Sequence, residues 1–322
     1  MLIDLAPMEG ITTFVFRKNF HKYFGGIHRC YTPFLSSLHL STQQKNEVLP
    51  EHNEGMTVIP QILTNRTDEF LEISKALQEY GYTTVNFNLG CPSGTVVSKH
   101  RGSGFLNVPL QLEQFLDEVF EKCPLKISIK TRIGFEDEEE WESLLRLYEK
   151  YPLDELIVHT RLRSDLYKLP ARPEMILPAR NALEAGSFRR ADPGDTHPFL
   201  CYNGDITSKE SMNRVRAIDP LCDRIMVGRG LISDFNLIRR LTDEPLLEKS
   251  VYADFLWDLM HDYIELMQGS DRNVLYKMKE IWVYLGDSFT DSRPFVKKIK
   301  KSNRLSEYEA AAKELFAHCE LR

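Results

Sequence analysis

The chain contains 322 residues, of which 42% are hydrophobic and 27% are charged, and its formal net charge is −6. A chain of this length can bury a core as one large domain or as a large and a small one, and its composition is that of an ordinary globular protein. No apolar stretch approaches the ~20 residues that cross a bilayer, and the first residues lack the basic and apolar segments of a secretory signal. We therefore expect a cytoplasmic protein without a membrane partner. The six cysteines include no CxxC pair, so we expect no bound metal.

Short β-branched stretches alternate with longer amphipathic ones through the first 244 residues. Eight of the short stretches predict strands, at residues 2–6, 26–31, 57–63, 84–89, 126–132, 155–159, 199–203 and 224–227. The amphipathic stretches predict helices, for example at residues 67–79, 110–121, 138–151 and 208–218. Eight strand–helix units predict a (β/α)8 TIM barrel over residues 1–244. An open, doubly wound sheet is the alternative, which the lack of a Gly-x-Gly-x-x-Gly motif after the first strand disfavours.

The strand patterns stop after residue 244. Phe255, Leu259 and Tyr263 recur at helical spacing. We therefore predict a small all-helical domain over residues 245–322. Within the barrel, residues 186–197 are poor in apolar side chains, and we predict a long surface loop there, before the seventh strand.

Polar and reactive residues follow nearly every predicted strand. They are Pro7, Met8 and Glu9 after the first strand, Gln61 in the third, Asn88 and Cys91 at the end of the fourth, Lys130 in the fifth, His159 and Arg161 at the sixth, Asn203, Gly204 and Asp205 at the seventh, and Gly228 and Arg229 after the eighth. The carboxyl ends of the strands carry the active site in barrels of this class. We therefore predict one active site at this rim.

The individual rim residues allow more than one interpretation. Gly204 and Gly228 permit close approach of the backbone to a phosphate, which Arg229 would also contact, but the tripeptide that contains Gly204 is also a common turn. Lys130 ends an apolar strand, where it either forms a surface salt bridge or contacts an electron-rich ring or an anion. Cys91 lies in a tight Gly-Cys-Pro turn and is either a reactive thiol or an inert packed cysteine.

Taken together and in order, these motifs resemble one enzyme family. Residues 6–10 (APMEG), 88–92 (NLGCP), 130–134 (KTRIG), 159–161 (HTR), 203–206 (NGDI) and 227–230 (VGRG) are similar to the motifs of the tRNA-dihydrouridine synthases. The resemblance covers residues 6–230. Asn86 stands where the family often has Asp, and Thr160 replaces a frequent Gly.

The resemblance implies an enzyme that uses FMN, with NADPH or NADH as the reductant, to reduce a uridine of tRNA to dihydrouridine. Cys91 matches the residue that gives a proton to uracil C5, and Asn88 would contact the substrate. The residues that would bind FMN are Pro7, Met8, Glu9, Gln61, Lys130, His159, Asn203, Gly204, Asp205, Gly228 and Arg229. A flipped-out uridine is required, because a stacked base is out of reach.

The basic residues are concentrated near the carboxyl terminus. Residues 272–304 contain nine Lys or Arg and three Asp or Glu, a local net charge of +6. Lys297, Lys298, Lys300 and Lys301 are nearly contiguous. We predict that these lysines contact tRNA phosphates, and that Arg161 and Arg163 hold the phosphates nearest to the active site. A solvated helix face is the alternative for the lysines.

Two other functions compete with this interpretation. Another FMN-dependent barrel, similar to a dihydroorotate dehydrogenase, would act on a free pyrimidine and would not need the basic helical region. A non-catalytic tRNA-binding protein would not need Cys91 or the flavin residues. We expect a monomer in either case.

Overall fold

The computed structural model describes residues 1–37, 39–197 and 199–322. They form two compact units. The first unit consists of Met1–Pro7, His28–Ile206 and Glu210–Val227, and the second of Met8–Ile27, Thr207–Lys209 and Gly228–Arg322. The predicted boundary between residues 244 and 245 remains a prediction.

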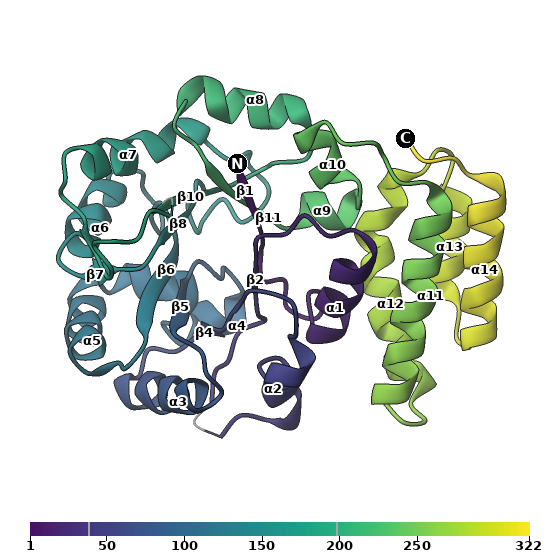
Figure 1. Cartoon of the computed structure of the whole chain (residues 1–322), viewed down its shortest axis with the longest axis horizontal. Helices are drawn as coiled ribbons and strands as arrows, with labels where there is room; N and C mark the ends of the chain where they lie inside the picture. The colour runs from purple at the N-terminus through teal and green to yellow at the C-terminus, as the bar shows by residue number, and fades with distance from the viewer. Residues whose placement is uncertain (38, 198) are drawn as a thin grey trace. The chain divides into compact units, whose positions relative to one another are not determined.

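The first unit is built around a sheet of nine parallel strands (Figure 1). Their order is β3 (Val58–Ile59), β2 (Arg29–Tyr31), β1 (Leu2–Leu5), β11 (Arg224–Val227), β10 (Leu200–Asn203), β8 (Leu156–His159), β6 (Lys126–Arg132), β5 (Thr84–Leu89) and β4 (Gln61–Ile62). The two end strands, β3 and β4, are separated in sequence only by Pro60, which cannot donate a ladder hydrogen bond. They are therefore two halves of one strand, and the order closes into the predicted eight-stranded barrel.

Helices lie between the strands. They are α2 (Thr42–Asn46), α3 (Thr67–Glu79), α4 (Gly94–Val97), α5 (Pro109–Lys122), α6 (Glu140–Tyr148), α7 (Leu177–Glu184) and α8 (Lys209–Ile218), with short 3₁₀ turns at Pro50–His52, Gly102–Asn107 and Pro173–Ile176. Among them, α3, α5, α6 and α8 fall at the four amphipathic stretches that predicted helices. The helix predicted at residues 67–79 has the same bounds as α3. The pattern was clear there because Phe70, Ile73 and Leu77 form one buried stripe. The helix predicted at 138–151 is shorter, since it ends at Tyr148.

The predicted surface loop over residues 186–197 also contains one short strand. Within it, β9 (Arg189–Arg190) pairs in parallel with β7 (Pro152–Leu153). The segment has no apolar alternation that would reveal a strand. Its pairing depends on a partner that is distant in sequence.

The barrel interior is arranged in layers, because every second residue of a strand points inward. Near the amino ends, Arg224 Nε lies 2.7 Å from Asp4 Oδ2 and 2.9 Å from Glu155 Oε1, and all three side chains are buried. Burial raises the pKa of Glu155 above its usual range, although the positive charge of Arg224 opposes this shift. Asp4, Glu155 and Cys201 are grouped closely enough to hold a metal ion, but Arg224 already supplies positive charge to both carboxylates.

Two residues further along the strands the interior becomes mainly apolar. Ala6, Tyr31, Ile59, Ile157, Cys201 and Met226 form this middle layer of buried residues. A further step of two residues brings Gln61, Lys130, His159 and Asn203 to the carboxyl ends of their strands. The strand register therefore places polar side chains above an apolar layer, at the rim where the sequence predicts the active site.

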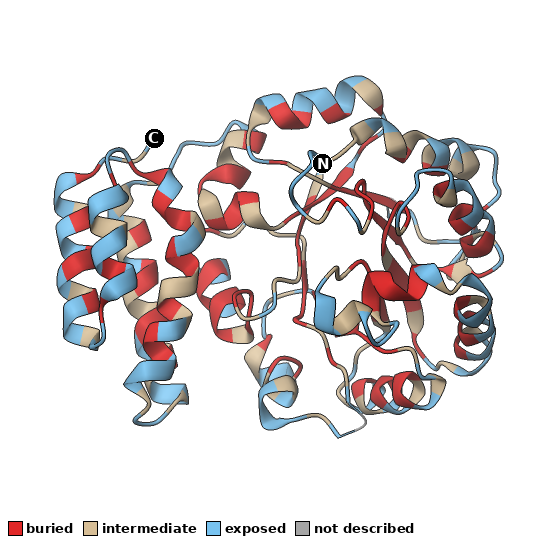
Figure 2. Cartoon of the chain, turned by 180° about the vertical axis from the view of Figure 1, so that it is seen from behind, coloured by how far each residue is buried: buried red, intermediate tan, exposed pale blue. Residues whose placement is uncertain are grey.

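The second unit is helical, which confirms the predicted helical carboxyl-terminal region. It contains α1 (Phe14–Tyr23), α9 (Arg229–Ser233), α10 (Leu237–Thr242), α11 (Lys249–Leu266), α12 (Asp271–Leu285), α13 (Arg293–Lys301) and α14 (Leu305–His318), with a 3₁₀ turn at Gly286–Ser288. Rings of α1, α11 and the segment before α10 pack edge to face, for example Phe16 with Phe255 and Phe20 with Phe235. In Figure 2 the helices alternate between buried and exposed stretches, whereas the strands are largely buried. Among the described residues, no helix combines the length and apolar character that crossing a membrane requires.

Candidate active site

The polar rim of the barrel is connected by hydrogen bonds between side chains of different strands. Lys130 Nζ of β6 donates to Asn203 Oδ1 of β10 at 2.7 Å, and Asn203 Nδ2 donates to the carbonyl oxygen of Met226 at 2.9 Å. On the other side of Lys130, Asn88 Nδ2 of β5 donates to Gln61 Oε1 of β4 at 2.7 Å. Four of the predicted site residues are thus brought into one polar layer.

Lys130 has an unusual electrostatic environment. Burial lowers its pKa from 10.5 to about 8, and the neighbouring positive charge of Arg132 adds to this effect. Its hydrogen bond goes to a neutral amide oxygen rather than to a carboxylate. A cation inside the barrel with a neutral partner fits an electron-rich ring or an anion better than it fits the surface salt bridge that was the alternative.

The Cys91 turn is held by contacts on both sides. Asn88 Oδ1 accepts hydrogen bonds from the backbone N–H groups of Gly90 and Cys91, each at 3.0 Å. The Cys91 carbonyl accepts from Ser103 N at 3.1 Å and from Ser103 Oγ at 2.8 Å. Gly102 has a φ of +55°, and a Cβ there would lie 2.9 Å from the Cys91 carbonyl oxygen, so glycine is required. The thiol is therefore presented by a fixed turn.

Cys91 differs from most other cysteines of the chain. It is half-buried, whereas Cys30, Cys201, Cys222 and Cys319 are buried. Burial raises the pKa of the thiols of Cys123, Cys201, Cys222 and Cys319, which lowers the fraction of each thiol that is in the thiolate form. Partial exposure in a fixed turn at the barrel rim suits a reactive thiol, and the functional role of Cys91 remains a prediction.

Arg132 belongs to the KTRIG motif of the fifth predicted strand, but the sequence assigned it no role. Its side chain is fully buried, and burial lowers its pKa. Nε donates to the Gly90 carbonyl at 2.9 Å, and Nη1 donates to the Leu162 carbonyl at 2.7 Å. Arg132 therefore ties the Cys91 turn to the segment after β8. The available signal was its spacing of two from Lys130, which places both side chains on the same face of β6.

The residues after β8 form a second connected group. Arg161 is 2% exposed, donates to His159 Nε2 at 3.1 Å and forms an ion pair with Asp205. Because a guanidinium only donates, His159 Nε2 accepts, which leaves the ring proton of a neutral imidazole on Nδ1. The exposed ring of Tyr167, another residue without a sequence signal, lies 5.8 Å from the Arg161 guanidinium carbon.

These contacts bear on the predicted roles of the two arginines. In this arrangement Arg161 is occupied inside the protein, so a phosphate could reach it only if Asp205 moved away. Arg163 stacks its guanidinium over the Phe135 ring at 5.1 Å and is half-buried. Contact of either arginine with RNA remains a prediction.

Gly204 has a local reason for being glycine. A Cβ at this position would collide with the hydroxyl group of Tyr202. The close approach that we predicted at Gly204 thus involves a side chain of the same barrel. A phosphate contact of the Gly204 backbone stays a prediction.

The other predicted cofactor residues follow β1 and β11 in the sequence. Pro7 is the last residue of the first segment of the barrel unit, whereas Met8, Glu9, Gly228 and Arg229 belong to the second unit. Met8 N donates to Thr12 Oγ1 at 2.8 Å, and Gly228 precedes the first residue of α9, Arg229. Their contacts with a cofactor remain predictions.

A comparison with family models decides the family. The model described as "Dihydrouridine synthase (Dus)" matches residues 4–318, which is nearly the whole chain. The chain belongs to the dihydrouridine synthase family. This confirms the resemblance seen in the motifs, and it makes an oxidoreductase the class of enzyme.

Named relatives of this dihydrouridine synthase family member agree with that assignment. The tRNA-dihydrouridine synthase B of Pasteurella multocida is 28% identical over 248 residues, which are 77% of this chain and 70% of that protein. The tRNA-dihydrouridine(16) synthase of Aquipseudomonas alcaligenes is 27% identical over 251 residues, 75% of each chain. Among solved structures, the phosphoribosylanthranilate isomerase of Pyrococcus furiosus is 14% identical, with a TM-score of 0.43 over 76% of this chain and 99% of that one. At that level of likeness, the barrel assignment rests on the strand order of the chain itself.

The predicted lysine cluster of this family member lies on α13. Lys297, Lys298, Lys300 and Lys301 are all exposed, while Ile299 between them is buried. Lys298 Nζ lies 2.6 Å from Glu314 Oε2 of α14, so one of the four is already ion-paired. The accessibility of the cluster is compatible with phosphate contacts and also with a solvated helix face.

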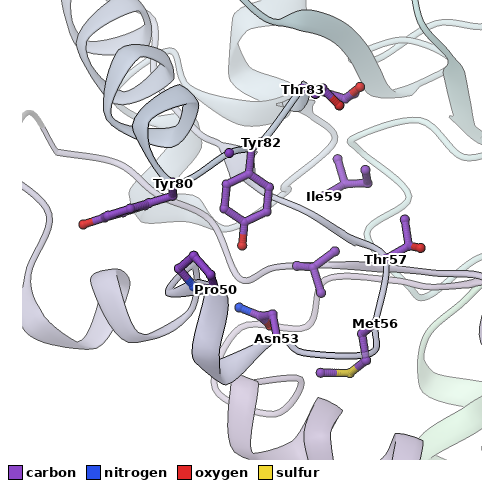
Figure 3. Close-up of a pocket in the computed structure, with 11 residues that line it drawn as sticks. Pro50, Asn53, Met56, Thr57, Ile59, Tyr80, Tyr82 and Thr83 are labelled. Carbon is purple, nitrogen blue, oxygen red and sulfur yellow. The ribbon is translucent and has the colours of Figure 1, made fainter.

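A pocket of about 340 Å³ opens at the amino ends of β3 and β5 (Figure 3). Its lining includes Pro50, Met56, Thr57, Tyr80 and Tyr82. The hydroxyl of Tyr82 donates to the carbonyl of Val48 at 2.9 Å. Because the rim residues are at the opposite ends of the strands, this pocket is separate from the candidate active site of this family member.

Proposed function

We propose that this chain reduces a uridine of tRNA to 5,6-dihydrouridine, with a bound FMN that NADPH or NADH reduces. The observation that carries the proposal is the polar rim of the barrel, where Lys130 and the fixed Cys91 turn end neighbouring strands, in a chain that belongs to the dihydrouridine synthase family. FMN, when bound, would supply the hydride for uracil C6. The chain itself must bind the flavin, orient the base and deliver a proton.

The residues at the rim fit a flavin. Lys130 places a positive charge inside the barrel without a carboxylate as its hydrogen-bond acceptor. Gln61, Asn203 and neutral His159 supply amide and imidazole groups that can donate to or accept from a heteroaromatic ring. Lys130 would stabilise negative charge on the ring, and the amides would fix its orientation.

Cys91 provides the remaining chemical step. Addition of two hydrogens across the C5–C6 double bond requires a hydride at one carbon and a proton at the other. The Cys91 S–H bond breaks as the new C5–H bond forms, and solvent later returns a proton to the thiolate. The hydrogen bonds of Asn88 and Ser103 to the Cys91 backbone hold the sulfur in place for this transfer.

The direct test is a comparison of substrates. Purified protein, supplied with FMN and NADPH, is incubated with tRNA transcribed without modifications and, separately, with uridine or orotate. We expect dihydrouridine in the tRNA, detected by mass spectrometry of its nucleosides, and negligible turnover of the free pyrimidines. Turnover of a free pyrimidine with no product in tRNA would instead support the dihydroorotate dehydrogenase-like function.

The lowered pKa of Lys130 predicts that FMN binding depends on pH. In the flavin-free protein Lys130 loses its charge around pH 8, whereas contact with an electron-rich ring favours the charged form. Above pH 8 binding must therefore take up a proton, so the affinity should fall by up to about tenfold per pH unit. By the same linkage, the flavin-free protein should gain folding stability from Lys130 between pH 8 and the unfolded value of 10.5, because the unfolded chain holds the proton more tightly.

Flavin fluorescence quenching between pH 7 and 9 would measure this dependence. Lys130→Met should bind FMN more weakly and remove the slope. Lys126→Met is the matched control, because Lys126 is at the amino end of the same strand and pairs with Asp192. A slope that survives in Lys130→Met would assign the titration to another group.

A further inference from the structure

Four buried polar side chains form a continuous chain of hydrogen bonds across β4, β5 and β6. They are Gln61, Asn86, Asn88 and Ser128, each at most 6% exposed. Asn88 Nδ2 donates to Gln61 Oε1 at 2.7 Å, Gln61 Nε2 donates to Asn86 Oδ1 at 2.7 Å, and Asn86 Nδ2 donates to Ser128 Oγ at 2.9 Å. The series begins at Asn88, which contacts the Cys91 turn, and three hydrogen bonds lead from Asn88 to Ser128.

The direction of every link is determined by the backbone at its two ends. Backbone N–H groups only donate, so the oxygen of Asn88 must face Gly90 and Cys91, and its nitrogen must face Gln61. The nitrogen of Gln61 then faces Asn86. At the far end, the Ser128 hydroxyl can donate to the Val85 carbonyl at 3.4 Å, which leaves Ser128 Oγ free to accept from Asn86.

The order of these links makes each amide dependent on its neighbour. If one amide reversed, two donors or two acceptors would face each other in a buried layer, where an unsatisfied polar group is costly. Asn86 occupies the central position, because it supplies the acceptor that keeps the nitrogen of Gln61 away from Asn88. Asn88, in turn, provides both hydrogen bonds that hold the Cys91 turn from inside the barrel.

We propose that Asn86 is a positioning residue for this reaction: through Gln61 and Asn88 it sets the orientation of the Gln61 amide and fixes the Cys91 turn. The assignment of Cys91 as proton donor rests on the proposed function, whereas the mechanical link from Asn86 to Cys91 does not.

The acceptor oxygen is the feature that position 86 must provide. Asn86→Leu has a similar size and cannot accept from Gln61. Asn86→Asp keeps an acceptor, and the Ser128 hydroxyl can turn to donate to it. Asn86→Ala removes the acceptor without adding bulk, so it serves if the leucine does not fold.

The test measures the Cys91 thiol directly. Iodoacetamide alkylation of each variant is followed by peptide mass spectrometry, and the rate at Cys91 is divided by the rate at Cys123. Cys123 is the internal reference, since it is the only other half-buried cysteine among the described residues and lies at the end of α5. We expect the ratio to rise about tenfold in Asn86→Leu or Asn86→Ala, because the turn loses one of its supports, and to return to the wild-type value in Asn86→Asp.

A second measurement separates this inference from the proposed function. With the flavin reduced beforehand, single-turnover dihydrouridine formation should fall about tenfold in Asn86→Leu and recover in Asn86→Asp. A wild-type alkylation ratio in both Asn86→Leu and Asn86→Ala would overturn the positioning role. A changed ratio in a protein that forms no dihydrouridine would retain the link between Asn86 and Cys91 and reject the proposed reaction.

Discussion

Replacement of Cys91 by alanine is expected to lower dihydrouridine formation by ~10²–10⁴-fold, which is the usual contribution of a positioned general acid. FMN should remain bound, and its reduction by NADPH should proceed at the wild-type rate, because Lys130 and Asn203 keep their hydrogen bond. The two half-reactions can be measured separately, with flavin absorbance for reduction and nucleoside mass spectrometry for product.

The matched control is Cys123→Ala. Cys123 is half-buried, as Cys91 is, but follows α5 and lies outside the hydrogen-bonded rim. This variant should retain full activity. Near-normal product formation by Cys91→Ala would show that Cys91 only shapes the turn, and the proton would have to come from another group.

Loss of the lysine cluster on α13 is expected to have the largest effect on tRNA affinity. Replacement of Lys297, Lys298, Lys300 and Lys301 by alanine removes four exposed positive charges. Each phosphate contact that is lost should reduce the slope of log affinity against log salt by about 1, so the slope should flatten by up to about 4. Binding titrations at several salt concentrations measure this, while reduction of the flavin by NADPH should be unchanged.

A variant of equal charge is the control for this experiment. Lys45, Lys75, Lys122 and Lys150 are exposed on the barrel unit, and Lys150 is ion-paired with Glu113 as Lys298 is with Glu314. Replacing these four by alanine changes the net charge equally and should alter the salt slope much less. Equal slopes for the two variants would mean that the α13 lysines are a solvated helix face and that general charge determines binding.

Local pattern was sufficient for most of the fold. The barrel strands were predictable because each is a short apolar stretch bounded by turns, and the helix at 67–79 because its apolar residues repeat at helical spacing. The rim residues were predictable for a related reason. Parallel strands bring all their carboxyl ends to one edge, so position in the sequence implies position at the site. The ordered set of motifs also identified the family without any knowledge of the contacts that their residues make.

Tertiary structure decided which side chains meet. The contacts of Arg132 with Gly90 and Leu162 join segments that are distant in sequence, and no periodic pattern encodes such contacts. The burial of Arg161 against Asp205 has the same origin, since the sequence alone presents Arg161 as a basic residue at a strand end. The strand β9 is defined by its pairing with β7, which is distant in sequence. Hydrophobic periodicity reports how one segment faces a core, whereas the direction of a hydrogen bond, as in the link from Asn86 to Cys91, depends on the atoms that other segments bring to it.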